Sequence, residues 1–249
     1  MKIGFVVSII FMGFIATGCG GGRAVVLGHT PLLSKFDKPE VPGEFKGGVA
    51  LSKVRAVVVE EASLKTEVKD FHNMYNDQQV LGGRLDVGFS SFLSGYYRNY
   101  EDTVEVLGLK AQLVGAPKDK RDHGFKMTAA VEAGYFHGIT DRENEREAFV
   151  HIESFDFSVN SGYRINRHLL WYANLFYNHY NFYGELLSNQ QVLFSERKNN
   201  RYFGPLVGLN IDFDAGFHLT LEWGRVRLLS PGERSAFTYP FGLSAGFSW

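Results

Sequence analysis

Residues 200–213, NRYFGPLVGLNIDF, decide the fold class, because apolar and polar side chains alternate along them. One face is apolar and carries Phe203, Val207, Leu209, Ile211 and Phe213, with Pro205 among them. The other face carries Tyr202, Gly204, Gly208, Asn210 and Asp212, interrupted only by Leu206. A period of two is the signature of a β-strand with different surroundings on its two faces.

The same alternation recurs from about residue 79 to the end of the chain. We predict eight strands, at 79–97, 101–115, 123–137, 149–164, 168–183, 200–213, 217–228 and 236–249. Residues 45–61 also have strand character, so that 45–78 is either an extra strand or plug, or the first part of a barrel. With a weak partner in 63–79 or 24–36, the number of strands becomes ten.

Aromatic residues stand at the ends of the apolar rows. The row in 125–135 begins with Phe125 and ends with Tyr135, and the row in 237–249 has aromatic residues at both ends around Leu243 and Ala245. Aromatic ends around an aliphatic middle are typical of the two girdles of a transmembrane β-barrel. The row from 125 to 135 extends about 34 Å. Tilted by about 40°, it spans roughly 26 Å, close to the height of such a barrel's apolar band.

The opposite faces of these strands carry charges that a soluble core could not hold. The charges that we expect to face the lumen are Arg84, Asp86, Lys110, Lys126, Glu132 and Glu222. Because both signs are present and an eight-stranded interior is narrow, they favour a plugged, salt-bridged lumen over a selective pore. Ten strands would loosen that conclusion.

The N-terminus has the layout of an export signal. Lys2 precedes an apolar run, and small residues lead to Cys19, which is the single cysteine of the chain. Residues 1–18 are too short for a spanning helix and fit a cleaved signal peptide. Ala16-Thr17-Gly18-Cys19 resembles a bacterial lipobox, although the usual leucine is Ala16. The resemblance implies that Cys19 is acylated, for example with palmitate, and anchors the protein in the outer membrane.

The last eight residues, GLSAGFSW, end in an aromatic residue. They resemble the C-terminal signature of bacterial outer-membrane β-barrel proteins, in which the barrel assembly machinery recognises the last strand. The resemblance implies an antiparallel, up-and-down transmembrane barrel over 79–249, with Phe247 and Trp249 as its assembly signature. The partners implied are outer-membrane lipids, the lipoprotein processing machinery and the barrel assembly machinery.

Residues 19–44 are rich in Gly and Pro, which predicts an acylated flexible tether with a solvated Lys35. If both ends of the barrel lie in the periplasm, turns near 116–122, 165–167 and 214–216 are periplasmic. Loops near 98–100, 138–148, 184–199 and 229–235 then face outward. The two long loops, 138–148 and 184–199, are candidates for contact with an extracellular partner.

Composition excludes several classes of function. The 26 basic and 27 acidic residues balance, so nothing indicates nucleic acid as a partner. Apart from the leader, no apolar run reaches the length of a spanning helix. No His or Cys pair has the spacing of a metal site, and no Gly-rich loop predicts a cofactor.

Function is the least determined property. A small, charge-plugged lumen with long outer loops favours a structural or surface-interaction role without catalytic residues. The first alternative is a rim enzyme acting on membrane lipids, because His137, His151, His179 and His218 lie near strand ends and Glu153 shares a face with His151. We favour interfacial histidines without catalysis. The second alternative is a porin-like transporter of small solutes or lipids, if the barrel is wide.

Overall fold

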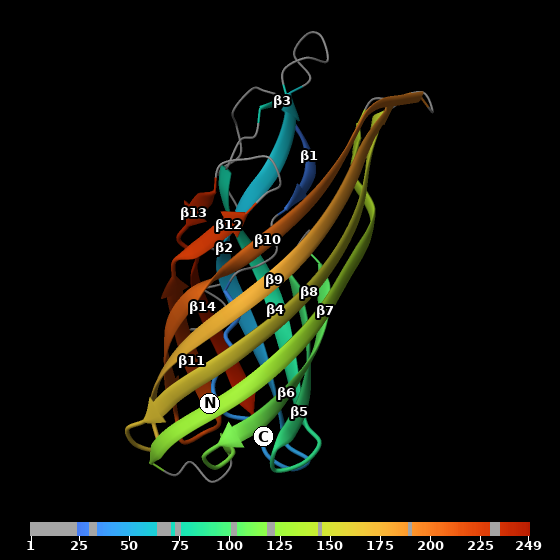
Figure 1. The fold of residues 1–249 in the computed structure, drawn as a ribbon. Helices are drawn as coiled ribbons and strands as arrows, with labels where there is room; N and C mark the ends of the chain where they lie inside the picture. The colour runs from blue at the N-terminus through green and yellow to red at the C-terminus, as the bar shows by residue number, and fades with distance from the viewer. Residues whose placement is uncertain are drawn as a thin grey trace, which may run out of the picture.

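The computed structural model describes residues 24–29, 34–63, 71–72, 76–100, 104–118, 123–143, 146–188, 191–229 and 235–249. They form one antiparallel β-sheet that closes on itself as a barrel (Figure 1). The barrel elements are β2 (Gly47–Ser63), β4 (Asn76–Gly88), β5 (Leu93–Tyr100), β6 (Glu105–Val114), β7 (Gly124–Glu143), β8 (Arg146–Arg164), β9 (Leu169–Ser188), β10 (Gln191–Asp212), β11 (Phe217–Gly224), β12 (Val226–Leu229), β13 (Ala236–Thr238) and β14 (Phe241–Ser248). β1 (Ala24–His29) and β3 (Phe71–His72) pair with β2 outside this circuit.

Two of the barrel strands are interrupted. β11 and β12 both pair with β10. On their other side, β12 pairs with β13 and β11 pairs with β14. The second break falls at Pro240, which has no N–H to donate to a sheet. Counted as continuous strands, these elements make a barrel of ten strands, with β1 and β3 as two extra strands.

The expected count of eight strands is therefore too low by two, and the alternative of ten is confirmed. One missing strand came from the predicted strand 79–97, which is a hairpin of β4 and β5. Its turn is made by Ser90, whose Oγ accepts hydrogen bonds from the backbone N–H groups of Phe92 (3.3 Å) and Leu93 (3.1 Å). The other is 45–61, which is the barrel strand β2 and not a plug.

The barrel closes between its first and last strands. β14 pairs with β2 from Gly242↔Val54 to Ser248↔Gly48, and the backbone N–H of Trp249 donates to Gly47 O (3.2 Å). The C-terminus thus lies beside the start of β2, at the end of the barrel where the chain turns between β8 and β9 and between β10 and β11 (Figure 1). We call this the turn end, and the opposite end the extension end.

The extension end takes its name from β7–β10, which extend well beyond β11 and β14 (Figure 1). β2, with β1 and β3 paired to it, also reaches this end. These strands have 20, 19, 20 and 22 residues, about twice what a membrane-spanning strand needs. The prediction that segments 138–148 and 184–199 are loops is therefore wrong, because most of their described residues are in paired strands. These segments lack a regular apolar–polar alternation in the sequence, so the strand signal is weak there although the backbone pairing continues.

The two faces of the wall have opposite character, as the alternation predicted. Exposed side chains on the outer face include Phe125, Val131 and Tyr135 on β7, and Trp171, Leu175 and Tyr177 on β9. The inner face is buried and rich in charged and amide side chains. Among the described residues, no helix is long and apolar enough to cross a membrane.

Candidate functional site

A segment of the N-terminal region, residues 34–42, lies inside the barrel. Lys35 is only 1% exposed, and the other buried members are Ser34, Phe36, Asp37, Glu40 and Val41. The prediction of a flexible tether over 19–44 with a solvated Lys35 is therefore wrong where the chain is described. The physical reason is that this segment carries charges of both signs and finds partners of opposite sign on the inner wall. We call residues 34–42 the plug.

The plug runs along the lumen from a level midway along β8 to the turn end. β1, which precedes it, pairs with the part of β2 at the extension end, from Ala24↔Ser63 to His29↔Val58. Lys35 then reaches Asp156 midway along β8, and Glu40 reaches Arg164 at the last residue of β8. The chain turns back into β2 at the turn end. The N-terminal segment therefore passes through the lumen before the chain enters β2, the first barrel strand.

Wall glycines make room for the plug. A Cβ on Gly242 would lie 2.5 Å from Cζ of Phe36, and a Cβ on Gly162 would lie 2.8 Å from Cγ of Pro39. Real Cβ atoms do not approach other atoms this closely, so larger residues at these positions would push the plug away. The glycines are thus part of how the wall accommodates the segment.

The upper part of the plug is held by Lys35. Its Nζ lies 2.6 Å from Oδ2 of Asp156 and 3.5 Å from Oε2 of Glu132. Glu132 is shared, since Nη2 of Arg98 lies 2.5 Å from the same oxygen and the Tyr96 hydroxyl donates to Oε1 (2.8 Å). The lysine therefore balances the charge of a buried cluster, which without it would contain two carboxylates and one arginine.

Glu222 holds the backbone of the plug. Its Oε2 accepts hydrogen bonds from the N–H groups of Lys35 (2.6 Å) and Phe36 (3.0 Å), and its Oε1 accepts from the hydroxyl of Tyr172 (3.3 Å). On β4, which β14 and β2 separate from β11, Arg84 donates to Lys35 O (2.8 Å) and pairs with Asp37 (2.7 Å). Backbone and side chains are therefore bound at the same level, which fixes the register of the plug.

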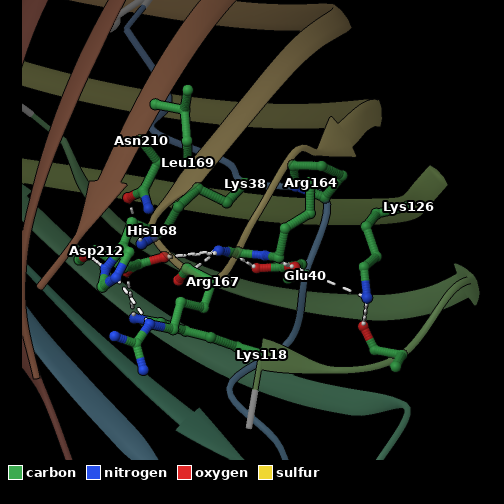
Figure 2. Close-up of polar contacts among 12 residues, drawn as sticks. Lys38, Glu40, Lys118, Lys126, Arg164, Arg167, His168, Leu169, Asn210 and Asp212 are labelled. Atoms are coloured by element: carbon green, nitrogen blue, oxygen red, sulfur yellow. Dashed lines mark hydrogen bonds and ion pairs between the residues drawn. The ribbon is translucent and has the colours of Figure 1, made fainter. Parts of the chain in front are cut away.

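The lower part of the plug is held by Glu40 (Figure 2). Its two oxygens accept from Nε (2.7 Å) and Nη2 (2.5 Å) of Arg164, in the bidentate geometry that suits a guanidinium. Arg164 also binds Asp212 (3.1 Å), and Lys118 approaches Asp212 (3.4 Å). Nearby, Lys38 donates to Oδ1 of Asn210 (3.1 Å). The ends of β8 and β10, the segment that follows β6 and the plug therefore meet in this network.

The structure brings the six predicted lumen charges to the inner wall. Arg84, Lys110, Lys126, Glu132 and Glu222 are buried, and Asp86 pairs with Arg84 (2.9 Å). Lys126 donates to Ala116 O (2.9 Å) and faces Glu40 at 3.9 Å. Lys110 reaches Lys38 O (3.4 Å). The charges therefore bind the plug as well as one another.

Several residues of this site were missed from the sequence. They are Lys35, Asp37 and Glu40 of the plug and Arg98 and Arg164 of the wall. The available signals were the alternating charges of residues 35–40 and the inward glycines at 162 and 242. Neither signal names its partner, because the ion-pair partners of these residues lie between 34 and 124 positions away in the chain.

An apolar layer fills the lumen between the charged network and the extension end. Along β8 its members precede Asp156, and along β10 they precede Asn210. The layer comprises Val104, Val106, Val150, Ile152, Phe176, Tyr180, Phe182, Tyr202, Leu206, Val226 and Leu228. At the turn end, a cavity of about 50 Å³ remains beside Lys38, Lys110 and His218. In the described part of the chain, the lumen is therefore closed twice, once by charge and once by apolar packing.

Three of the four candidate histidines lie on the outer face of β7–β9, and the fourth lies inside the barrel. His137 and His151 are neighbours on the outer face of β7 and β8, with their Nδ1 atoms 3.4 Å apart, and His151 Nε2 lies 3.5 Å from Glu153 Oε1. His179 lies on the outer face of β9, whereas His218 is buried on the inner wall near the turn end. Within the described ranges, no three His, Cys, Asp or Glu residues are grouped to hold a metal ion.

These features define a class: a closed, ten-stranded antiparallel β-barrel with an apolar exterior and a lumen filled by its own N-terminal segment. No protein-family model and no curated protein matches the chain.

The chain is similar to solved structures of bacterial outer-membrane proteins. The attachment invasion locus protein Ail of Yersinia pestis is 10% identical, with 83% of this chain and 99% of that chain covered and a TM-score of 0.37. The outer membrane protease OmpT of Escherichia coli is 9% identical, with 84% and 97% covered and a TM-score of 0.44. The outer membrane channel DcaP of Acinetobacter baumannii is 8% identical, with 82% and 96% covered and a TM-score of 0.24. At such identities neither activity nor partner transfers, so the function has to come from this chain's own residues.

Proposed function

We propose that this protein is a lipid-anchored outer-membrane β-barrel that does not conduct, and that it presents its N-terminus and the β7–β10 extension at the cell surface for interaction. The observation that carries the proposal is the plug. It occupies the lumen, it is ion-paired to the wall at both of its ends, and it leads the chain from the extension end to the turn end.

The outer face of the barrel supports a place in the membrane. Leu175 is 62% exposed between Trp171 and Tyr177, which are also exposed, and β14 repeats this order with Phe241, Leu243 and Phe247. An exposed apolar wall with aromatic ends costs free energy in water, whereas lipid is a favourable surrounding for it. Short turns and the C-terminus at one end support placing that end in the periplasm.

The closed lumen argues against transport. A solute would have to displace buried ion pairs such as Glu40–Arg164 and then cross the apolar layer. Removing one partner from a buried ion pair costs about 3–5 kcal/mol, so spontaneous opening would be rare. A structural or interacting role fits this interior better than a pore.

The path of the plug also bears on the lipid anchor. Cys19 lies outside the described residues, but Ala24 pairs at the extension end of β2. Five residues span at most about 17 Å. If the turn end is periplasmic, a lipid on Cys19 would therefore lie near the outer leaflet, on the same side as the β7–β10 extension.

Cysteine labelling in whole cells tests this topology. An acylated Cys19 has no free thiol, so a cysteine introduced by Ala24→Cys or Asp214→Cys is the reactive one. We expect a membrane-impermeant maleimide to label Ala24→Cys in intact cells, and Asp214→Cys only after the outer membrane is permeabilised. Labelling of Asp214→Cys alone in intact cells would show the opposite orientation. Labelling of native Cys19 would show that its thiol is free, and would contradict the lipid anchor.

Planar bilayers test the closed lumen. We expect the full chain, inserted as shown by its altered gel mobility before and after boiling, to give no steady conductance. A stable conductance from the inserted chain would contradict a sealed barrel and favour the transporter.

A further inference from the structure

The outer face of β7–β10 changes character directly above the aromatic residues of the barrel wall. Tyr177 on β9 pairs with Phe157 on β8 and Phe203 on β10, which makes an aromatic row across three strands. One step further toward the extension end, His179 pairs with Phe155 and Arg201. That step is about 7 Å along a strand. Above the aromatic row, the outer face is no longer apolar.

Two further rows continue this polar surface. Asn181 pairs with Glu153 and Asn199, and Tyr183 pairs with His151 and Arg197. His137 adjoins His151 on β7. A groove of about 320 Å³ is lined by His151, Glu153, Asn181, Phe182, Tyr183 and Arg197. We call this surface, with Arg201 and His179, the polar belt.

Two arginines of β10, Arg197 and Arg201, belong to the polar belt. Arg197 and Arg201 are exposed, and among the described residues no carboxylate lies within ion-pair distance of either. Glu153 is the carboxylate lining the groove, and its ion-pair partner is His151. On the adjoining β12, Arg227 pairs opposite Phe203 and is also exposed. The surface therefore offers three guanidinium groups at the edge of the apolar band.

We propose that the polar belt binds the phosphate groups of phosphorylated lipids in the outer leaflet. Arginine suits phosphate because its planar guanidinium donates two parallel hydrogen bonds to phosphate oxygens. The position favours a lipid headgroup, since the belt begins where the aromatic girdle ends and acyl chains would lie along the apolar wall below it. Asn181, Asn199 and Tyr183 offer hydrogen bonds to headgroup hydroxyls. This inference rests on the proposed membrane orientation.

A lipid-binding experiment tests the polar belt. The full chain is inserted into nanodiscs of zwitterionic phosphatidylcholine and titrated with bisphosphorylated lipid A or with its dephosphorylated form. We expect at least about tenfold tighter binding of the phosphorylated form, because only that form offers phosphate oxygens to the guanidinium groups. The double variant Arg197→Gln/Arg201→Gln should lose this preference. Arg167→Gln, which removes an exposed arginine at the turn end, is the matched control and should keep it.

Each other outcome has a definite meaning. Equal binding of both lipid forms, or an unchanged preference in the double variant, overturns the site. Complete displacement of the lipid by equimolar inorganic phosphate would show a free-anion site in place of a headgroup site and also overturns it. A chain that does not insert into nanodiscs overturns the proposed function together with the site, whereas an inserted chain without a phosphate preference overturns the site alone.

Discussion

The carboxylate of Glu40 and the guanidinium of Arg164 form a buried bidentate pair between the plug and the last residue of β8, 124 positions apart in the chain. Arg164 is fully buried and also binds Asp212 at the end of β10. The pair therefore ties the plug to two wall strands where they meet the turn end. The N-terminal segment is consequently part of the folded barrel's interior.

Glu40→Gln should destabilise the folded barrel strongly. The substitution leaves the Arg164 charge buried with only Asp212 to compensate it, and breaking such a pair costs about 3–5 kcal/mol. The measurement is urea unfolding of the chain in micelles, followed by tryptophan fluorescence. Glu44→Gln is the matched control, because Glu44 lies just beyond the plug and is exposed. Equal unfolding midpoints for the two variants would show that the plug does not contribute to stability.

Gly242→Ala should loosen the plug by contact with Phe36. The new Cβ would lie 2.5 Å from Cζ of that ring, and overpacking of this kind costs about 1–3 kcal/mol. Phe36→Ala in the same chain should restore part of the loss, since it removes the atoms that clash. Gly83→Ala is the control, because its Cβ meets only Ala50 O at 3.8 Å. If Phe36→Ala does not raise the unfolding midpoint of the Gly242→Ala chain, the clash does not involve Phe36.

Opening the barrel should require the loss of both closures. Replacing residues 34–42 by a Gly-Ser chain of the same length removes the charged closure, but the apolar layer remains. Tyr180 and Tyr202, whose rings pack edge-on in that layer at 6.3 Å, are the second closure. We expect conductance only when the Gly-Ser replacement is combined with Tyr180→Ser/Tyr202→Ser. The control combination uses Tyr177→Ser on the outer face. Conductance from the Gly-Ser replacement alone would mean that the apolar layer does not seal.

The outer wall could be predicted from the sequence, because alternation is a local property. Phe125, Val131 and Tyr135 needed only their own spacing to be placed on the outer face, and the structure exposes all three. The hairpin between β4 and β5 was missed for an equally local reason. Phe89-Ser90-Ser91-Phe92 contains no Gly or Pro, and the turn depends on the Ser90 side chain.

The plug could not be predicted, because its partners are set by the closed barrel. Lys35 with its following charges and prolines has the composition of a linker, and Asp156 and Glu132 become its neighbours only after the intervening strands, from β2 onward, have been ordered. Lys35 was therefore expected in solvent. A local pattern predicts which side chains of a strand share a face. Which segment fills the lumen depends on contacts that are distant in sequence.

Insertion should depend on the closing strand and not on the lipid. β14 pairs with β2 through Phe247↔Val49 and Ser248↔Gly48, and the backbone N–H of Trp249 donates to Gly47 O at the end of this pairing. Deleting residues 247–249 should leave an open sheet edge and prevent insertion. Cys19→Ala should leave the chain in the membrane fraction after carbonate extraction. Release of the Cys19→Ala chain into solution would show that the lipid is the main anchor and that the wall does not hold itself in the membrane.

A charge placed at two heights on β9 and β10 should distinguish a membrane barrel from a soluble one. Leu175 is exposed in the middle of the apolar band, and Leu175→Arg should cost about 2–4 kcal/mol if lipid surrounds it. Asn199→Arg lies on the outer face above the aromatic row and should cost little, because it adds a charge at headgroup level. In water both substitutions would be nearly neutral, since each side chain is exposed. Unfolding in lipid vesicles measures the difference, and equal stability of the two variants would contradict a lipid-facing wall at Leu175.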